Sequence, residues 1–186
     1  MGSIVKAIAI VAHPDDCVIF AWPFIEAHSE FEWQIFYLTY NCQDPRGKEI
    51  RDYWDKRKVH THFLGFEDDY QDQQTGSLTK WDGVHAALQI FSVINRYSPD
   101  LILTHNSDGD YGHIHHILVS GAVTSFAVEI PKVYFASTFN YNTKYEVKVP
   151  VCLDELPLHK SVIEGFQDRN TGLYIVTEPA QQLLKL

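Results

Sequence analysis

Short apolar runs rich in β-branched and aromatic residues alternate with longer amphipathic runs along the chain. Runs of the first kind are typical of buried strands, and a period near 3.6 residues is typical of helices. The pattern predicts strands at 6–12, 33–39, 100–104 and 132–137. It predicts helices at 20–29, 49–63, 83–97, 116–128 and 158–166, with Gly65 after the second and Ser98-Pro99 after the third.

The alternation of strand and helix predicts an α/β fold with an open, mostly parallel sheet that carries helices on both faces. The chain has 186 residues and 45% hydrophobic content, which suffices for one compact core. We see no repeat or linker in the sequence, so we expect a single domain over residues 1–186.

Charge and composition exclude several classes of partner. The chain has 15 basic and 24 acidic residues, and no basic cluster is long enough to follow a phosphate backbone, so we expect no nucleic-acid partner. The apolar runs are shorter than the roughly 20 residues that span a membrane. Lys6 interrupts the apolar start, so no signal peptide is predicted and we expect a cytoplasmic protein. The cysteines, at 17, 42 and 152, are expected to be free thiols because they form neither an even set nor a CxxC pair.

The first predicted strand ends abruptly in the polar motif HPDD, residues 13–16. Ligands bind at the carboxyl ends of strands in open α/β sheets, so this loop is placed for chemistry. His13 and Asp16 are three residues apart at a helix start, which puts both side chains on one face and leaves Asp15 free. Taken alone, the motif is equally typical of an ordinary helix cap.

A second polar segment, THNSDGDYGHIHH at 104–116, follows the predicted strand 100–104 and contains four histidines. Both segments leave the same edge of a parallel sheet, so His13 and Asp16 can meet a histidine of this second loop. Two imidazoles and a carboxylate bind a divalent metal and leave positions open for water. Two helix caps would not need three histidines, so the pair of motifs favours a metal site.

The remaining polar residues of the two motifs suit hydrolysis. Asp15 could accept a proton from an attacking water molecule. His116 lies deeper in the predicted helix and suits coordination, whereas His113 at its start could face a developing oxyanion or leaving group. Tyr111 could add a hydrogen bond there. In this scheme His113 is protonated, and either His113 or Asp15 protonates the leaving group.

Other polar residues receive more ordinary interpretations. We expect structural or supporting roles for His105 and His115. We expect the remaining histidines (28, 60, 62, 85 and 159) and the acidic residues Glu67, Asp68, Asp69 and Asp72 to be solvated. Arg46, Arg51 and Asn140 follow predicted strands and are candidate substrate contacts, with a plain surface role as the alternative.

The strand ending in AHPDD and the later strand followed by YGHxxH resemble the LmbE-like, or PIG-L-like, family of zinc-dependent N-deacetylases. The segments FLGFEDD (63–69) and LHKSVIEGFQ (158–167) add weaker matches. The resemblance implies a Rossmann-like fold and removal of an acetyl group from an N-acetylated amino sugar or sugar conjugate. It also implies zinc on His13, Asp16 and His116, with Asp15 as the base and His113 with Tyr111 stabilising the intermediate.

Two positions depart from the family pattern. Cys17 stands where the family usually has Glu, and its thiol could bind metal, oxidise or simply pack. His115 stands where the family's HxDH motif has an acid that orients the neighbouring histidine. Asp108 or Asp110 could substitute for that acid.

Three other functions remain open at this stage. Two histidines and a carboxylate also hold Fe(II) in oxygenases, and the ligand types would accept iron as well as zinc. Clustered Asp and His also serve metal-dependent phosphoesterases, although those gather more carboxylates for two metals. A non-catalytic sugar-binding protein could keep the metal site without turnover. The sequence leaves the substrate open, and also whether the chain forms a homo-oligomer.

Overall fold

A computed structural model describes residues 4–68, 81–136, 145–147, 153–166 and 172–186. Seven strands form one sheet in the order β3-β2-β1-β4-β5-β7-β6. β1 to β5 are parallel, and β7 is antiparallel to its neighbours β5 and β6. This sheet confirms the predicted open, mostly parallel α/β fold. The strands are β1 (Lys6–Val11), β2 (Glu32–Thr39), β3 (His60–Phe66), β4 (Leu101–Thr104), β5 (Lys132–Phe135), β6 (Tyr145–Glu146) and β7 (Leu173–Val176).

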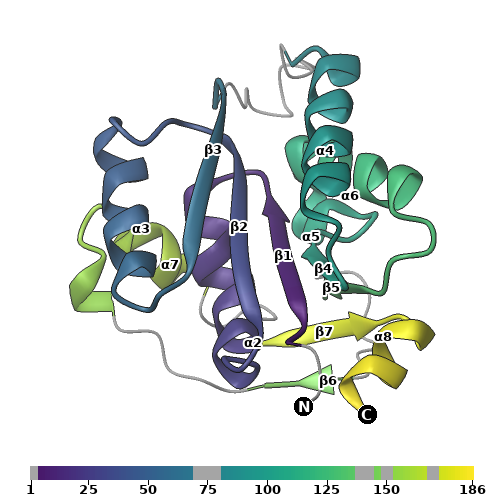
Figure 1. Cartoon of the computed structure of the whole chain (residues 1–186). Helices are drawn as coiled ribbons and strands as arrows, with labels where there is room; N and C mark the ends of the chain where they lie inside the picture. Colours follow the sequence, from purple (N-terminus) through teal and green to yellow (C-terminus); the bar gives the residue numbers. More distant parts are fainter. Residues whose placement is uncertain (1–3, 69–80, 137–144, 148–152, 167–171) are drawn as a thin grey trace.

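Helices cover both faces of the sheet, with α3 and α7 on one side and α4 and α6 on the other (Figure 1). The α-helices are α1 (Pro14–Asp16), α2 (Trp22–Ala27), α3 (Pro45–Asp55), α4 (Gly83–Tyr97), α5 (Gly109–Gly112), α6 (Ile114–Phe126), α7 (Lys160–Phe166) and α8 (Glu178–Leu184). A π-helical turn, η1 (Cys17–Ala21), joins α1 to α2, and η3 (Leu153–Glu155) is a 3-10 helix. The helical segment predicted at 20–29 therefore begins earlier, at Pro14 inside the HPDD motif, and ends at Ala27.

The central strand β1 contributes side chains to two hydrophobic clusters, one on each face of the sheet. Ala7, Ala9 and Val11 pack with residues of η1, α2 and α3, whereas Ile8 and Ile10 pack with residues of α4 and α6. Successive strand residues point to opposite faces, and here both faces are covered. This double burial explains why the strand is a continuous apolar run rather than an alternating one.

The predicted helix over 49–63 is wrong in its second half. α3 ends at Asp55, Lys58 adopts a left-handed φ of 60°, and residues 60–66 form β3 along the edge of β2. Pairing with β2 supplies backbone hydrogen bonds that a helix would otherwise make. Gly65 ends no helix: it has a φ of 80° next to a register shift between β2 and β3, where glycine adopts positive φ without strain. β6, β7 and α8 were also not predicted.

Tyr174 of β7 ties the C-terminal strands to the helix that follows β1. Its fully buried hydroxyl donates to the Phe20 carbonyl at 2.6 Å and accepts from the Phe24 amide at 3.1 Å. Tyr174→Phe should lower the free energy of unfolding by about 1–3 kcal/mol, because two buried backbone groups lose their partner. Urea denaturation measures this change.

Tyr134→Phe is the matched control, because the Tyr134 hydroxyl makes a longer, exposed contact of 3.3 Å with Thr124. Its effect should stay within about 0.5 kcal/mol. Equal losses in the two variants would contradict the role given to Tyr174.

Among the helices that the structure describes, none has both the length and the apolar character needed to span a bilayer.

Candidate metal centre

The polar residues that follow β1 to β4 meet at the carboxyl edge of the sheet. His13 follows β1, Tyr40 follows β2, Asp68 follows β3 and His105 follows β4. The four strands are parallel and adjacent, so their ends lie side by side. The fold therefore gathers residues that are up to 92 positions apart, from 13 to 105, at one place.

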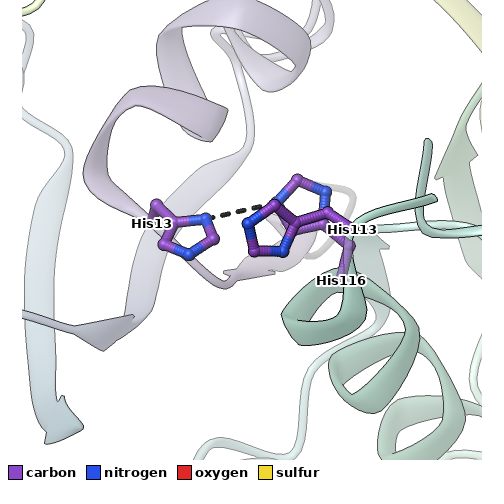
Figure 2. Close-up of side chains that lie close together, drawn as sticks. All are labelled: His13, His113 and His116. Carbon is purple, nitrogen blue, oxygen red and sulfur yellow. Dashed lines mark hydrogen bonds between the residues drawn. The ribbon is translucent and has the colours of Figure 1, made fainter. Parts of the chain in front are cut away.

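His13, Asp16 and His116 bring their donor atoms together. His13 Nδ1 lies 3.1 Å from Asp16 Oδ2 and 3.2 Å from His116 Nε2, and His116 Nε2 lies 3.2 Å from Asp16 Oδ1. Figure 2 shows the His13 ring facing the His116 ring, which comes from the first turn of α6. All three side chains are buried. The structure thus joins the three residues that the sequence proposes as ligands.

These separations fit a metal ion. Zinc–nitrogen bonds of about 2.0–2.1 Å in a tetrahedron place ligand atoms roughly 3.3 Å apart. Burial by itself would raise the pKa of Asp16, but the His116 and His13 rings outweigh it and hold that pKa well below its usual value. Asp16 is therefore ionised, as a metal ligand must be.

A carboxylate behind His116 orients its ring. Asp110 Oδ2 lies 3.0 Å from His116 Nδ1, the nitrogen turned away from His13. The same oxygen contacts His105 Nδ1, while His105 Nε2 accepts a hydrogen bond from the Ala12 amide at 3.0 Å. Metal-binding histidines usually give their second N–H to such a carboxylate. Asp110, rather than Asp108, therefore supplies the acid that position 115 lacks.

The backbone at Asp110 is strained in order to place this carboxylate. Its φ of 65° and ψ of −55° are values that a side-chain-bearing residue rarely adopts. Asp110 Oδ1 accepts from the Asn106 amide at 3.1 Å, and the Asn106 side chain donates to the Phe135 carbonyl. Strain of this kind costs about 1–3 kcal/mol and is characteristic of functional sites.

Asp110→Asn should weaken metal binding about 10- to 100-fold, because an amide holds the His116 N–H less firmly than a carboxylate does. Competition with a chromophoric chelator measures the dissociation constant. Asp108→Asn is the control and should leave the constant unchanged, because Asp108 enters the loop's hydrogen bonds through its backbone amide. An Asp110→Asn protein with wild-type affinity would contradict the orienting role.

His113 is set up as a neutral hydrogen-bond donor. It is the N-cap of α6, and its Nδ1 accepts from the His115 amide at 3.2 Å, which leaves the ring proton on Nε2. Burial, together with the His116 and His13 rings, lowers the pKa of His113 to about 2. The protonated His113 expected from the sequence therefore disagrees with this environment.

Asp15 lies beside His13 and Asp16, with a carboxylate oxygen within 4.8 Å of their ligand atoms, and it is held by Arg46 of α3. Arg46 Nη2 lies 3.2 Å from Asp15 Oδ2, and Arg46 Nη1 donates to the Tyr40 hydroxyl at 3.1 Å. These contacts place Arg46 inside the site rather than on the plain surface that was its alternative. Its contact with substrate stays a prediction.

A pocket of about 280 Å³ opens over the site. Asp15, His13, His113 and Tyr111 line its polar side, and the Tyr111 ring meets the His116 ring edge-on at 5.3 Å. Its apolar wall consists of Ile19, Val162 and Phe166. The pocket therefore offers a small substrate both the polar groups and a hydrophobic surface.

Two further side chains contact His13: Asp68, which was expected to be solvated, and His115, which was expected to have a structural or supporting role. Asp68 Oδ1 lies 3.5 Å from His13 Nε2 and Asp68 Oδ2 accepts from the Tyr40 hydroxyl, so Asp68 is no simple solvated residue. Asp68 follows β3 directly, and recognising that strand would have placed it at this edge. His115 is fully buried, with Nδ1 3.0 Å from His13 Nε2 and its ring stacked on Trp81.

His159 also differs from its expectation, whereas Arg51 agrees with its surface alternative. His159 is fully buried and its Nδ1 lies 2.6 Å from Glu49 Oε2, so it is not solvated. Arg51 contacts Asp52 and is not among the described residues that line the pocket, which favours a surface role. Asn140, Asp69 and Asp72 lie outside the described residues.

Cys17 packs in the core beside the site. It is fully buried, and burial raises the pKa of its thiol. A thiol in such surroundings is poorly ionised and unreactive. Of the three roles considered for Cys17, packing agrees with this position.

Solved structures share the fold at low sequence identity. A conserved protein from Thermus thermophilus matches with a TM-score of 0.64 and 13% identity, covering 95% of this chain and 96% of that one. The 4-carboxy-2-hydroxymuconate hydratase GalB from Pseudomonas putida matches with 0.60 and 15%, covering 88% and 83%. A zinc-inhibited form of teicoplanin deacetylase matches with 0.54 and 16%, covering 96% and 85%. Since a hydratase and a deacetylase both appear, the fold alone does not select a reaction.

Sequence comparison supplies the family. No curated protein matches the chain significantly. A family model does match, over residues 8–127, which include both polar motifs and more than half of the chain. The chain therefore belongs to the PIG-L family, described as GlcNAc-PI de-N-acetylase, as the two motifs predicted.

Proposed function

We propose that this protein is a zinc-dependent N-deacetylase that removes the acetyl group from an N-acetylated amino sugar or sugar conjugate. The convergence of His13, Asp16 and His116 within 3.1–3.2 Å of one another carries the proposal. Membership of the PIG-L family supports the reaction type.

His13, Asp16 and His116 would hold the metal. Zinc supplies Lewis-acid chemistry when bound, which makes water more acidic and polarises a carbonyl group. Two imidazoles and one carboxylate suit zinc and also accept Fe(II). A zinc-inhibited form of teicoplanin deacetylase, a protein with the same fold, shows that zinc binds to that protein, where it acts as an inhibitor.

Asp15 would accept the proton of the attacking water. It lines the pocket next to Asp16 but is turned toward Arg46. The ion pair with the guanidinium restricts rotation of the carboxylate, so the base is positioned before substrate binds. Water then attacks the amide carbonyl carbon.

His113 and Tyr111 would stabilise the oxyanion that develops during this attack. A neutral His113 donates a hydrogen bond from Nε2 because its Nδ1 already accepts from the α6 backbone. Its low pKa makes it a poor proton source for the amine. Asp15, protonated in the first step, would therefore return that proton to the leaving amine, giving acetate and a free amine.

The decisive experiment measures amine release from a panel of N-acetylated amino sugars, using protein loaded with a known amount of zinc. Stoichiometric acetate and amine supports the proposal. Phosphate release from phosphoesters, or oxygen uptake by the iron-loaded protein under controlled oxygen, would favour the phosphoesterase or the oxygenase instead. Saturable sugar binding without turnover would identify a non-catalytic binding protein.

Residues 1–186 are proposed to act as one catalytic domain in the cytoplasm. A single sheet connects the described N-terminal and C-terminal strands. Cys17 and Cys42 are free thiols, which is typical of a reducing compartment.

A further inference from the structure

His13 has a second metal-binding side. Its Nδ1 faces Asp16 and His116, while its Nε2 faces His115 Nδ1 at 3.0 Å and Asp68 Oδ1 at 3.5 Å. The ligand atoms of His13, His115 and Asp68 all lie within 4.8 Å of one another. One imidazole ring thus connects two separate clusters of donor atoms.

A hydrogen bond accounts for only part of this second cluster. With Nδ1 used as a ligand, the His13 ring keeps a single proton on Nε2, which can bond His115 Nδ1 at 3.0 Å while Asp68 Oδ1 stays at 3.5 Å. The separations of 3.0 and 3.5 Å lie on either side of the roughly 3.3 Å expected between ligands of a tetrahedral zinc. The cluster therefore has the dimensions of a cation site.

We propose that His13 Nε2, His115 Nδ1 and the Asp68 carboxylate form a second site for a divalent transition metal such as zinc. His13 would bridge the two ions as an imidazolate, and its Nε2 proton would leave to solvent when the second ion binds. A histidine at position 115 supplies a nitrogen ligand of the kind that zinc and copper prefer.

The surroundings hold both new ligands in place. The His115 ring stacks on the Trp81 ring with centroids 3.9 Å apart and planes 9° apart. The Tyr40 hydroxyl donates to Asp68 Oδ2 at 2.9 Å, which leaves Oδ1 toward His13. The Asp68 side chain is 31% exposed, so an ion can reach the site from solvent. Two cations on one ring repel each other, and the second should bind more weakly.

Occupation of this site should affect the pocket. His13 and Asp68 both line it, so a cation between them would occupy part of its polar wall. This consequence rests on the proposed function: the first equivalent of zinc should activate deacetylation and the second should inhibit it.

The experiment is a zinc titration of the full-length, chelator-stripped protein without substrate, followed by isothermal calorimetry and metal analysis. The wild type should bind two equivalents, one tight and one weaker. Asp68→Asn and His115→Asn should each bind one, and Asp108→Asn should bind two as the control. A single equivalent in the wild type, or two in both variants, would overturn the second site.

Copper tests the bridge directly. Two Cu²⁺ ions that share an imidazolate couple magnetically, so the electron paramagnetic resonance signal should fall as the second equivalent binds. Two equivalents that give an additive, uncoupled signal would overturn the bridging role of His13. If His115→Asn does not fold, Asp68→Asn still tests the second site, because Asp68 is partly exposed and asparagine has the same shape.

These readouts are independent of turnover, so they separate this proposal from the deacetylase. Two coupled ions without amine release would leave the second site standing and refute the deacetylase. A single bound ion together with amine release would refute the second site and support the deacetylase.

Discussion

Asp15→Asn should abolish most deacetylation while the protein keeps its zinc. Asparagine has the shape of aspartate but cannot accept a proton from water at neutral pH, and general-base catalysis is worth roughly 10²- to 10⁴-fold. Asp15 is paired with Arg46. The contacts of 3.1–3.2 Å that join His13, Asp16 and His116 do not involve it. The proposed ligand set therefore stays complete in this variant. We expect kcat to fall by this factor at unchanged zinc content.

The measurements are steady-state amine release and metal analysis of the same preparation. Asp52→Asn removes the same charge from the exposed face of α3 and should retain wild-type kcat. Unchanged turnover in Asp15→Asn would dismiss Asp15 as the base. Loss of zinc together with activity would instead assign Asp15 to the ligand set.

His116→Ala should release the metal. Its Nε2 lies within 3.2 Å of both His13 Nδ1 and Asp16 Oδ1, so truncation removes one of three donors. Loss of a ligand should exceed the 10- to 100-fold effect of losing a supporting partner, so we expect affinity to fall by more than about 100-fold. Activity should disappear with the zinc.

Zinc content after dialysis, with circular dichroism to confirm folding, tests this expectation. His85→Ala is the matched control, because His85 lies in the first turn of α4, where its ring meets Gln89 and Phe66 rather than the donor atoms. Full zinc occupancy in a folded His116→Ala protein would remove His116 from the ligand set. The Asp16 carboxylate would then need another partner, and His105, whose Nε2 lies 3.5 Å from it, is the nearest alternative.

The sequence predicted those parts of the fold whose signal is local. β1 and β4 are buried on both faces and read as short continuous apolar runs, and α4 shows a clear helical period between Asp82 and Ser98. β3 was not predicted because it lies at the edge of the sheet, where its residues are only partly buried and form no continuous apolar run. Its residues alternate His, Thr and Phe, a pattern that does not distinguish an edge strand from the end of an amphipathic helix.

The two polar motifs determined which residues could bind a metal, because the sequence shows directly both the residue types and their position after an apolar strand. Which nitrogen faces which partner depended on the tertiary structure. Asp110 reaches His116 only through a strained turn, and Arg46 reaches Asp15 only because α3 packs beside α1. Asp68 and His115 meet His13 because three strand ends share one edge of the sheet. Spacing along a chain fixes which side chains share a helix face, whereas the packing of separate elements fixes distances of about 3 Å between them.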